Sequence, residues 1–170
     1  SSPGPPGRFL VAANLPYSVA TPLLLALLRR EPPPADLVIM VQREVADRIR
    51  AGPGEEPYGP LSVLVQAVAR AAPVLSVRRE SFHPAPAVSS AVVRVTPDPA
   101  LRAAAGDLDH LRRVVHAAFG LRRKTLANSL SKSGVAPAAL GTAGIAPGRR
   151  AEDLSTAEFL ALARAVPSLA

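Results

Sequence analysis

Four short apolar runs punctuate the first hundred residues, and each has the length and composition of a β-strand. RFLVAA (residues 8–13) lies between a glycine and an asparagine, which predicts a strand covered on both faces. ADLVIMVQ (residues 35–42) predicts a second buried strand. VLSV and SAVVRVTP predict two closing strands, separated by the proline-containing segment RRESFHPAPAVS.

Segments of helical periodicity separate these runs. Thr21 followed by Pro22 predicts an N-cap and a first-turn proline, and the leucine-rich helix that follows ends at the prolines of residues 32–34. REVADRIRA and LSVLVQAVARA (residues 61–71) predict two more helices, joined by the loop GPGEEPYGP. Strands that alternate with helices and then end strand–strand are typical of an α/β sheet with an antiparallel edge.

The second part of the chain has only helical periodicity. TPDPALRAAAG indicates a linker, DLDHLRRVVHAAF predicts a helix, and KTLANSLSKSG predicts a shorter one that ends at Gly134. Ser155 and Glu158 form a capping box ahead of a final helix. We therefore expect residues 1–98 to form an α/β portion and residues 99–170 a small all-helical domain.

Composition is typical of a folded protein, and its basic excess fits either a polyanionic partner or a GC-rich genome. The 170 residues are 48% hydrophobic, and no apolar stretch approaches the ~18 residues of a membrane span. Cysteine is absent, which excludes disulfides, and the three histidines lack metal-ligand spacing, so we expect no metal. Net charge is +7, and Lys plus Arg outnumber Asp plus Glu by 10 to 8 in residues 1–100 and by 10 to 5 in residues 101–170. This excess favours nucleic acid, although 18 arginines against 2 lysines also fit a GC-rich genome.

The tetrapeptide NLPY follows the first predicted strand, and ligands of open α/β sheets bind at that end of a strand. The Asn14 oxygen and a nearby backbone carbonyl could accept both hydrogens of an adenine amine and so stabilise the positive charge that develops during methyl transfer. Tyr17 offers a flat face for stacking on a base, and Pro16 stiffens the turn. Taken alone, the motif favours a simple turn over a site of chemistry.

The surrounding sequence resembles one family over nearly all of residues 8–166. NLPY, MVQREVADRI, PYGPLSVLVQ, FHPAPAVSSAVVR, RRKTLANSL and RRAEDLSTAEF follow one another as they do in the bacterial 16S rRNA adenine N6,N6-dimethyltransferases, the KsgA/RsmA family. The resemblance implies a partial class I methyltransferase (Rossmann-like) sheet followed by the helical domain. It also implies a cytoplasmic, monomeric enzyme that uses S-adenosyl-L-methionine to dimethylate two adjacent adenines near the 3′ end of 16S rRNA in the immature 30S subunit.

The resemblance assigns roles to particular residues. Asn14 would contact the methionine end of the cofactor and the target amine, the Leu15 carbonyl would take the second hydrogen, and Tyr17 and Phe82 would close over the two faces of a base extruded from its stack. The residues implied are Asn14, Leu15, Pro16, Tyr17 and Phe82 for catalysis and Arg122, Arg123 and Lys124 for rRNA phosphates. Without the resemblance, Phe82 is more typical of a core side chain, and the basic triplet could equally be a solvated helix end.

The first half of the family pattern has no counterpart in this sequence. A Gly-rich cofactor loop and an acidic ribose-binding residue are both absent, and the chain opens at the fourth strand of the expected sheet. We therefore expect the first strand to be an unpaired edge and the chain alone to be inactive. Two alternatives stay open: a 23S rRNA adenine dimethyltransferase of the macrolide-resistance type, and a non-catalytic rRNA-binding or ribosome-assembly fragment.

The segment from Gln42 to Glu44 carries polar and charged side chains that suggest acid chemistry, but we interpret it as the start of a helix.

Overall fold

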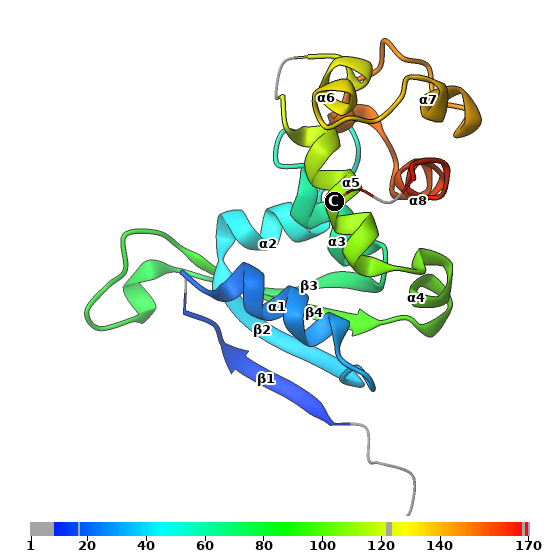
Figure 1. Cartoon of the computed structure of the whole chain (residues 1–170). Coiled ribbons are helices and arrows are strands. Elements are labelled where there is room, and N and C mark those ends of the chain that lie inside the picture. Colours follow the sequence, from blue (N-terminus) through cyan, green and yellow to red (C-terminus); the bar gives the residue numbers. More distant parts are fainter. Residues whose placement is uncertain (1–8, 17, 122–123, 168, 170) are drawn as a thin grey trace, which may run out of the picture.

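The protein contains one mixed four-stranded sheet. A computed structural model describes residues 9–16, 18–121, 124–167 and 169. Its strands lie in the order β1-β2-β4-β3 (Figure 1). They are β1 (Leu10–Asn14), β2 (Asp36–Gln42), β3 (Ala69–Val77) and β4 (Ser90–Pro97). β1 and β2 are parallel, and β4 is antiparallel to both β2 and β3, so the predicted α/β sheet with an antiparallel edge is confirmed.

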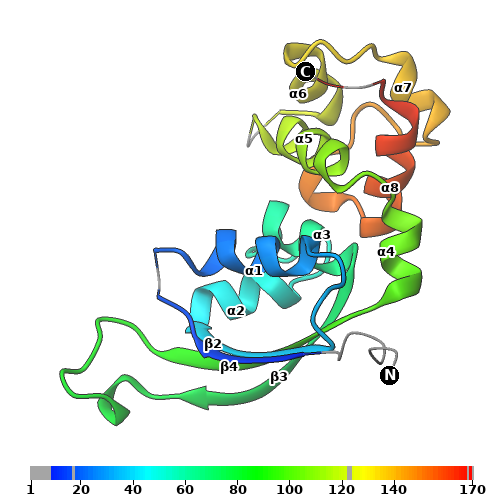
Figure 2. The same ribbon diagram turned by 60° about the horizontal axis from the view of Figure 1, so that its bottom comes forward.

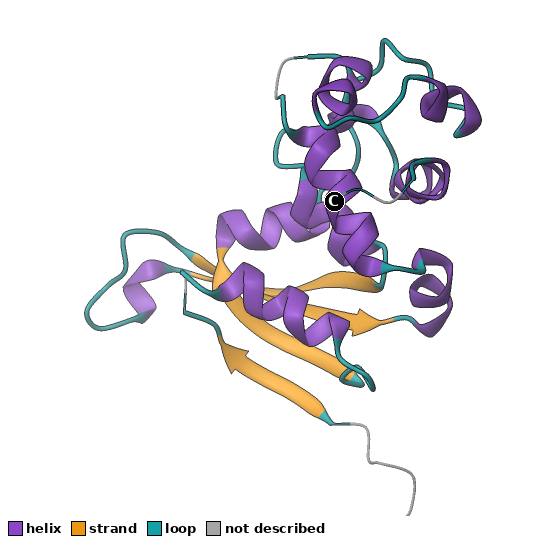
Figure 3. Ribbon diagram, viewed as in Figure 1, coloured by secondary structure: helices purple, strands orange, loops and turns teal. Residues whose placement is uncertain are grey.

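The helices form two groups. The first group covers one face of the sheet (Figure 2), and the chain beyond β4 is helical (Figure 3). The first group is α1 (Ala20–Arg29), α2 (Arg43–Arg50) and α3 (Pro60–Gln66). The second is α4 (Pro99–Ala105), α5 (Leu108–Phe119), α6 (Leu126–Lys132), α7 (Ala138–Thr142) and α8 (Thr156–Ala165), with a short 3₁₀ turn at Ala151–Asp153. Another 3₁₀ turn, Arg79–Ser81, lies between β3 and β4. No helix in the described ranges is long and apolar enough to cross a membrane.

The opposite face of the sheet is bare, which overturns the expectation that the first strand is covered on both faces. In β2, Ile39 is 0% exposed, whereas its neighbour Val38 points to the other face and is 39% exposed. In β1, Leu10 is 74% exposed. Within the described residues β1 pairs only with β2, so its second edge is also open, as predicted.

Several predicted boundaries were wrong for identifiable reasons. The helix expected over residues 61–71 ends at Gln66, because the chain joins β4 as a strand from Ala69. The expected linker contains α4, where the Asp98 carboxylate accepts hydrogen bonds from the N–H groups of Ala100 and Leu101. Helix α1 begins before the expected Thr21 cap. The helix that ends before Gly134 is confirmed, whereas α7 was not anticipated.

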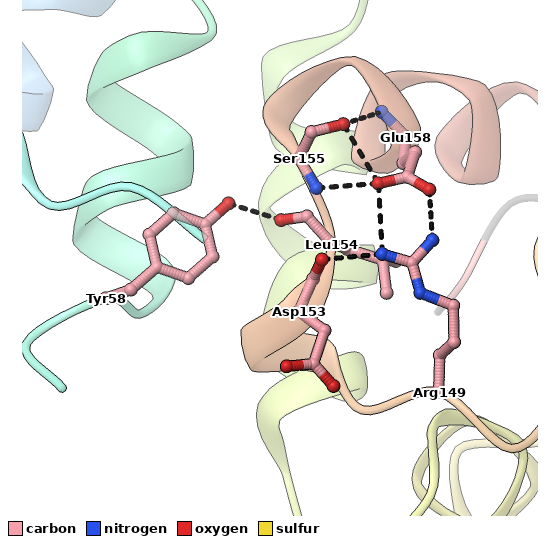
Figure 4. A network of polar contacts seen from close by, with 6 residues as sticks. All are labelled: Tyr58, Arg149, Asp153, Leu154, Ser155 and Glu158. Carbon is pink, nitrogen blue, oxygen red and sulfur yellow. Dashed lines mark hydrogen bonds and ion pairs between the residues drawn. The ribbon is translucent and has the colours of Figure 1, made fainter. Parts of the chain in front are cut away.

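The C-terminal helices are fixed to the sheet region by a buried polar contact. The Tyr58 hydroxyl, in the loop between α2 and α3, donates to the Leu154 carbonyl at 2.7 Å (Figure 4). Burial raises the pKa of Tyr58 to about 12. The predicted capping box at α8 is confirmed: the Ser155 N–H donates to the Glu158 carboxylate at 2.8 Å, and Arg149 forms an ion pair with that carboxylate.

Buried side chains from both regions belong to one hydrophobic core. Phe119 of α5 stacks on Phe159 of α8 and packs edge-on against Tyr58. The Arg102 side chain of α4 bonds to the carbonyls of Leu28 and Arg29 at the end of α1. These contacts give the helical region a fixed position relative to the sheet. The boundary at residues 98 and 99 stays a prediction.

Candidate active site and its relatives

Asn14 is the last residue of β1, at the carboxyl end of the parallel pair. Its position opposite Met40 of β2 places it on the bare face together with Leu10 and Ala12, and it is exposed. Within the described part of the chain, no residue forms a hydrogen bond with its side-chain amide. An open α/β sheet binds ligands outside the carboxyl ends of its strands, so this amide is available where a ligand is expected.

The two residues after Asn14 have different roles. Leu15 is 3% exposed, and its N–H donates to the Met40 carbonyl at 3.0 Å, which anchors the turn to β2. The Pro16 carbonyl accepts the N–H of Val19 at 3.0 Å, and this turn leads into α1. No described N–H donates to the Leu15 carbonyl. Asn14 and Leu15 are consecutive residues, and each offers an oxygen acceptor with no hydrogen-bond donor among the described residues.

The remaining predicted site residues are less closely assembled. Tyr17 lies outside the described residues. Phe82 is half-buried, and its N–H donates to the Arg79 carbonyl at 3.2 Å. Because β1 and β3 run in the same direction, Phe82 follows β3 at the same end of the sheet as Asn14, in the segment that projects from the sheet in Figure 1. Strands β2 and β4 lie between them, so the structure brings the two residues to the same end of the sheet but not into contact.

The predicted RNA-contact segment lies between α5 and α6. Arg122 and Arg123 are outside the described residues. Lys124 is exposed, and its N–H donates to the Leu121 carbonyl at 3.0 Å. Its ammonium group has no acidic partner among the residues with described positions, so it is available for an anionic ligand.

Metal chemistry finds no support in the described ranges, which hold no group of three or more His, Cys, Asp or Glu side chains able to bind a metal ion. Burial lowers the pKa of His116 on α5, with a smaller contribution from the nearby Arg112 charge. Neither group adjoins NLPY. The chemistry available at the carboxyl end of β1 is therefore that of amide and carbonyl oxygens.

An open α/β sheet with polar acceptors at the carboxyl end of a strand is typical of a Rossmann-like ligand-binding domain. Comparisons with known proteins identify the family within this class. A family model described as ribosomal RNA adenine dimethylase matches residues 5–166. The chain belongs to this family.

Curated relatives agree with the family assignment. The chain is 46% identical over 168 residues to ribosomal RNA small subunit methyltransferase A of Geobacter metallireducens, which covers 95% of this chain and 61% of the relative. It is 50% identical over 155 residues to the protein of the same name from Phenylobacterium zucineum, covering 91% and 54% of the two chains. The chain thus spans little more than half the length of these relatives.

Solved structures share the fold. A dimethyladenosine transferase from Plasmodium falciparum superposes with a TM-score of 0.78 at 24% identity, covering 95% of this chain and 67% of the other. The 23S rRNA methyltransferase ErmE superposes with a TM-score of 0.64 at 23% identity, covering 97% and 68%. The Rossmann-like architecture is therefore confirmed.

Proposed function

We propose that this chain forms the acceptor side of an rRNA adenine N6-dimethyltransferase that modifies two adjacent adenines near the 3′ end of 16S rRNA in the immature 30S subunit. Family membership supports adenine in ribosomal RNA as the substrate. The names of the relatives, ribosomal RNA small subunit methyltransferase A, favour the small-subunit RNA over 23S rRNA. We place the enzyme in the cytoplasm as a monomer. The observation that carries the proposal is the pair of unoccupied acceptors on Asn14 and Leu15.

The adenine amine is a weak nucleophile because its lone pair is delocalised into the ring. The Asn14 side-chain oxygen and the Leu15 carbonyl would each accept one N–H hydrogen, which holds the amine in place and favours a pyramidal nitrogen with a localised lone pair. As the amine acquires a methyl group it becomes positively charged, and both oxygens stabilise that charge. The proton then leaves the nitrogen to solvent, and no acidic or imidazole base is required.

The donor in this proposal is S-adenosylmethionine, which when bound would supply an electrophilic methyl group, its sulfur keeping the electron pair of the S–CH3 bond in the thioether product. Asn14 would also contact the methionine end of the donor. Tyr17 and Phe82 would stack on the two faces of the extruded base. The described residues suit the acceptor side of this reaction. The glycine-rich loop and ribose-binding carboxylate that would hold the donor are absent from the sequence.

A fusion protein tests the proposal. The N-terminal part of the Geobacter metallireducens relative, which has no counterpart here, is joined ahead of this chain and incubated with S-adenosylmethionine and immature 30S particles. Mass spectrometry of the RNA should detect N6,N6-dimethyladenine at two adjacent positions. Naked 23S rRNA is the competing substrate, and its preferential methylation would favour the macrolide-resistance type of enzyme. Tight 30S binding without methylation of either RNA would favour a non-catalytic assembly factor.

A further inference from the structure

Gln42 occupies a position whose usual structural role it does not perform. It is the last residue of β2 and the N-cap of α2, yet its side chain makes no capping hydrogen bond. N-cap positions favour Ser, Thr, Asp and Asn, whose short side chains accept hydrogen bonds from the first turn of the helix. Helix capping therefore does not account for a glutamine at this position.

The sheet places Gln42 beside Asn14. Alternate residues of β2 point to the bare face, as the exposure of Val38 shows, and Gln42 belongs to that set. Asn14 pairs with Met40, so Gln42 lies one strand across and two residues further toward the carboxyl end. With strands about 4.8 Å apart and a rise of about 3.3 Å per residue, the two Cα atoms are about 8 Å apart. A purine ring can bridge that distance.

The Gln42 carboxamide is also available. It is half-buried, and no described residue forms a hydrogen bond with it. Gln66, the other glutamine of the chain, differs: its amide donates to the carbonyls of Ile49 and Ala51 at 3.2 and 2.8 Å and so has a structural role. Gln42 therefore presents an amide donor at the same end of the sheet as the two oxygen acceptors and on the same face as the Asn14 side chain.

We propose that Gln42 is a base-recognition residue whose amide N–H donates to N7 of the target adenine. This inference rests on the proposed function. If Asn14 and Leu15 hold both hydrogens of the exocyclic amine, N7 is the acceptor beside that amine on the same edge of adenine, and a glutamine amide is well suited to it. Cytosine also carries an exocyclic amine but has a C–H group on the corresponding side. Gln42 would thus help the site to select adenine.

A double-mutant cycle in the fusion protein tests this contact. The substrate is a short RNA with two adjacent adenines, in which the first is adenine or 7-deazaadenine. Loss of one neutral hydrogen bond should lower kcat/KM for the deaza substrate about five-fold. Gln42→Met should lower kcat/KM for adenine by a similar factor and remove the preference between the two substrates. Gln66→Met is the matched control and should keep the preference while lowering thermal stability.

Two outcomes would overturn the assignment. One is a Gln42→Met protein that keeps its five-fold preference for adenine. The other is a Gln42→Met protein in which cofactor affinity and melting temperature both fall, which would mean that Gln42 stabilises the fold by packing. If the fusion protein with Gln42 methylates neither these RNAs nor immature 30S particles, the proposed function fails. Binding of the two RNAs to this chain then tests the contact alone, and equal affinities for both RNAs would contradict it.

Discussion

Asn14 has the arrangement expected of a residue that acts in the proposed reaction. It ends a strand whose next residue, Leu15, is anchored to β2 at 3.0 Å, yet its own amide bonds to no residue in the described ranges. The anchored Leu15 backbone holds the Asn14 side chain in position, and the exposed Asn14 oxygen can still accept a hydrogen bond from a ligand. Such preorganisation stabilises a charge that appears only during reaction.

Replacing Asn14 should separate catalysis from binding. Asn14→Ala removes one of two acceptors that face the developing positive charge, and we expect methyl transfer by the fusion protein to fall about 10²–10³-fold. Affinity for 30S particles should be unchanged because the proposed phosphate contacts lie in the segment between α5 and α6. Asn128→Ala, on the exposed surface of α6, is the matched control and should alter neither quantity. A variant that loses 30S binding along with activity would contradict this role.

Lys124 should act through its charge alone. If its ammonium group contacts a phosphate, Lys124→Gln should reduce the slope of log affinity against log salt concentration by about one unit. Filter binding to a 16S rRNA fragment at several salt concentrations measures that slope. Lys132, exposed at the end of α6, is the only other lysine, and Lys132→Gln should leave the slope unchanged. Equal slopes for both variants would remove Lys124 from the interface.

At the scale of elements, the sequence predicted those strands and helix ends that are determined by residues close together in the chain. The strand over 36–42 and the capping box at Ser155 and Glu158 were both identified, because apolar runs and caps act within a few residues. The start of β3 was missed because Ala69 pairs with Pro97, which is distant in the sequence. Pairing with β4 overrides the helical pattern of residues 61–71.

In the candidate site, too, contiguous residues were predicted from the sequence, whereas a relation between distant residues was not. NLPY was found because its residues are contiguous, and the resemblance gave Phe82 its role. Gln42 was interpreted only as part of a helix start, because its relation to Asn14 exists only once β1 and β2 are paired. A parallel register cannot be read from two separate strands. The missing signal was an N-cap glutamine, which is an unusual choice for that position.

The α8 capping box should make stability depend on pH in the acid range. The hydrogen bonds from Arg149 and from the Ser155 N–H lower the pKa of Glu158 below its ordinary value. A lowered folded-state pKa adds stability above the unfolded value, about 4.3, which is lost as pH falls through the folded pKa. Glu158→Gln should therefore lower the free energy of unfolding at pH 7 and flatten its decline below about pH 4.3. Urea unfolding followed by circular dichroism measures both, with the exposed Glu56→Gln as the control.

At the scale of the whole molecule, the sheet has one face covered by helices, one bare face, and an open edge along β1. The acceptor groups lie at that edge, whereas no described segment covers the bare face. We expect the chain alone to bind S-adenosylmethionine weakly or not at all, because in the proposed arrangement Asn14 would contact only the methionine end of this ligand. Isothermal titration calorimetry should show no heat at micromolar concentrations, while the fusion protein should bind. Micromolar affinity of the chain alone would overturn this expectation.

The bare face itself can be tested with two adjacent residues of β2. Val38 is 39% exposed and Ile39 is 0% exposed, so Val38→Lys should change the free energy of unfolding of this chain by less than about 0.5 kcal/mol, whereas Ile39→Lys should prevent folding. In the fusion protein the added segment should pack on the bare face and bury residue 38. Val38→Lys should then abolish cofactor binding and methyl transfer, although the isolated chain tolerates it. A fusion protein that remains active with Lys at this position would mean that the face stays open to solvent and that the donor-binding segment packs elsewhere.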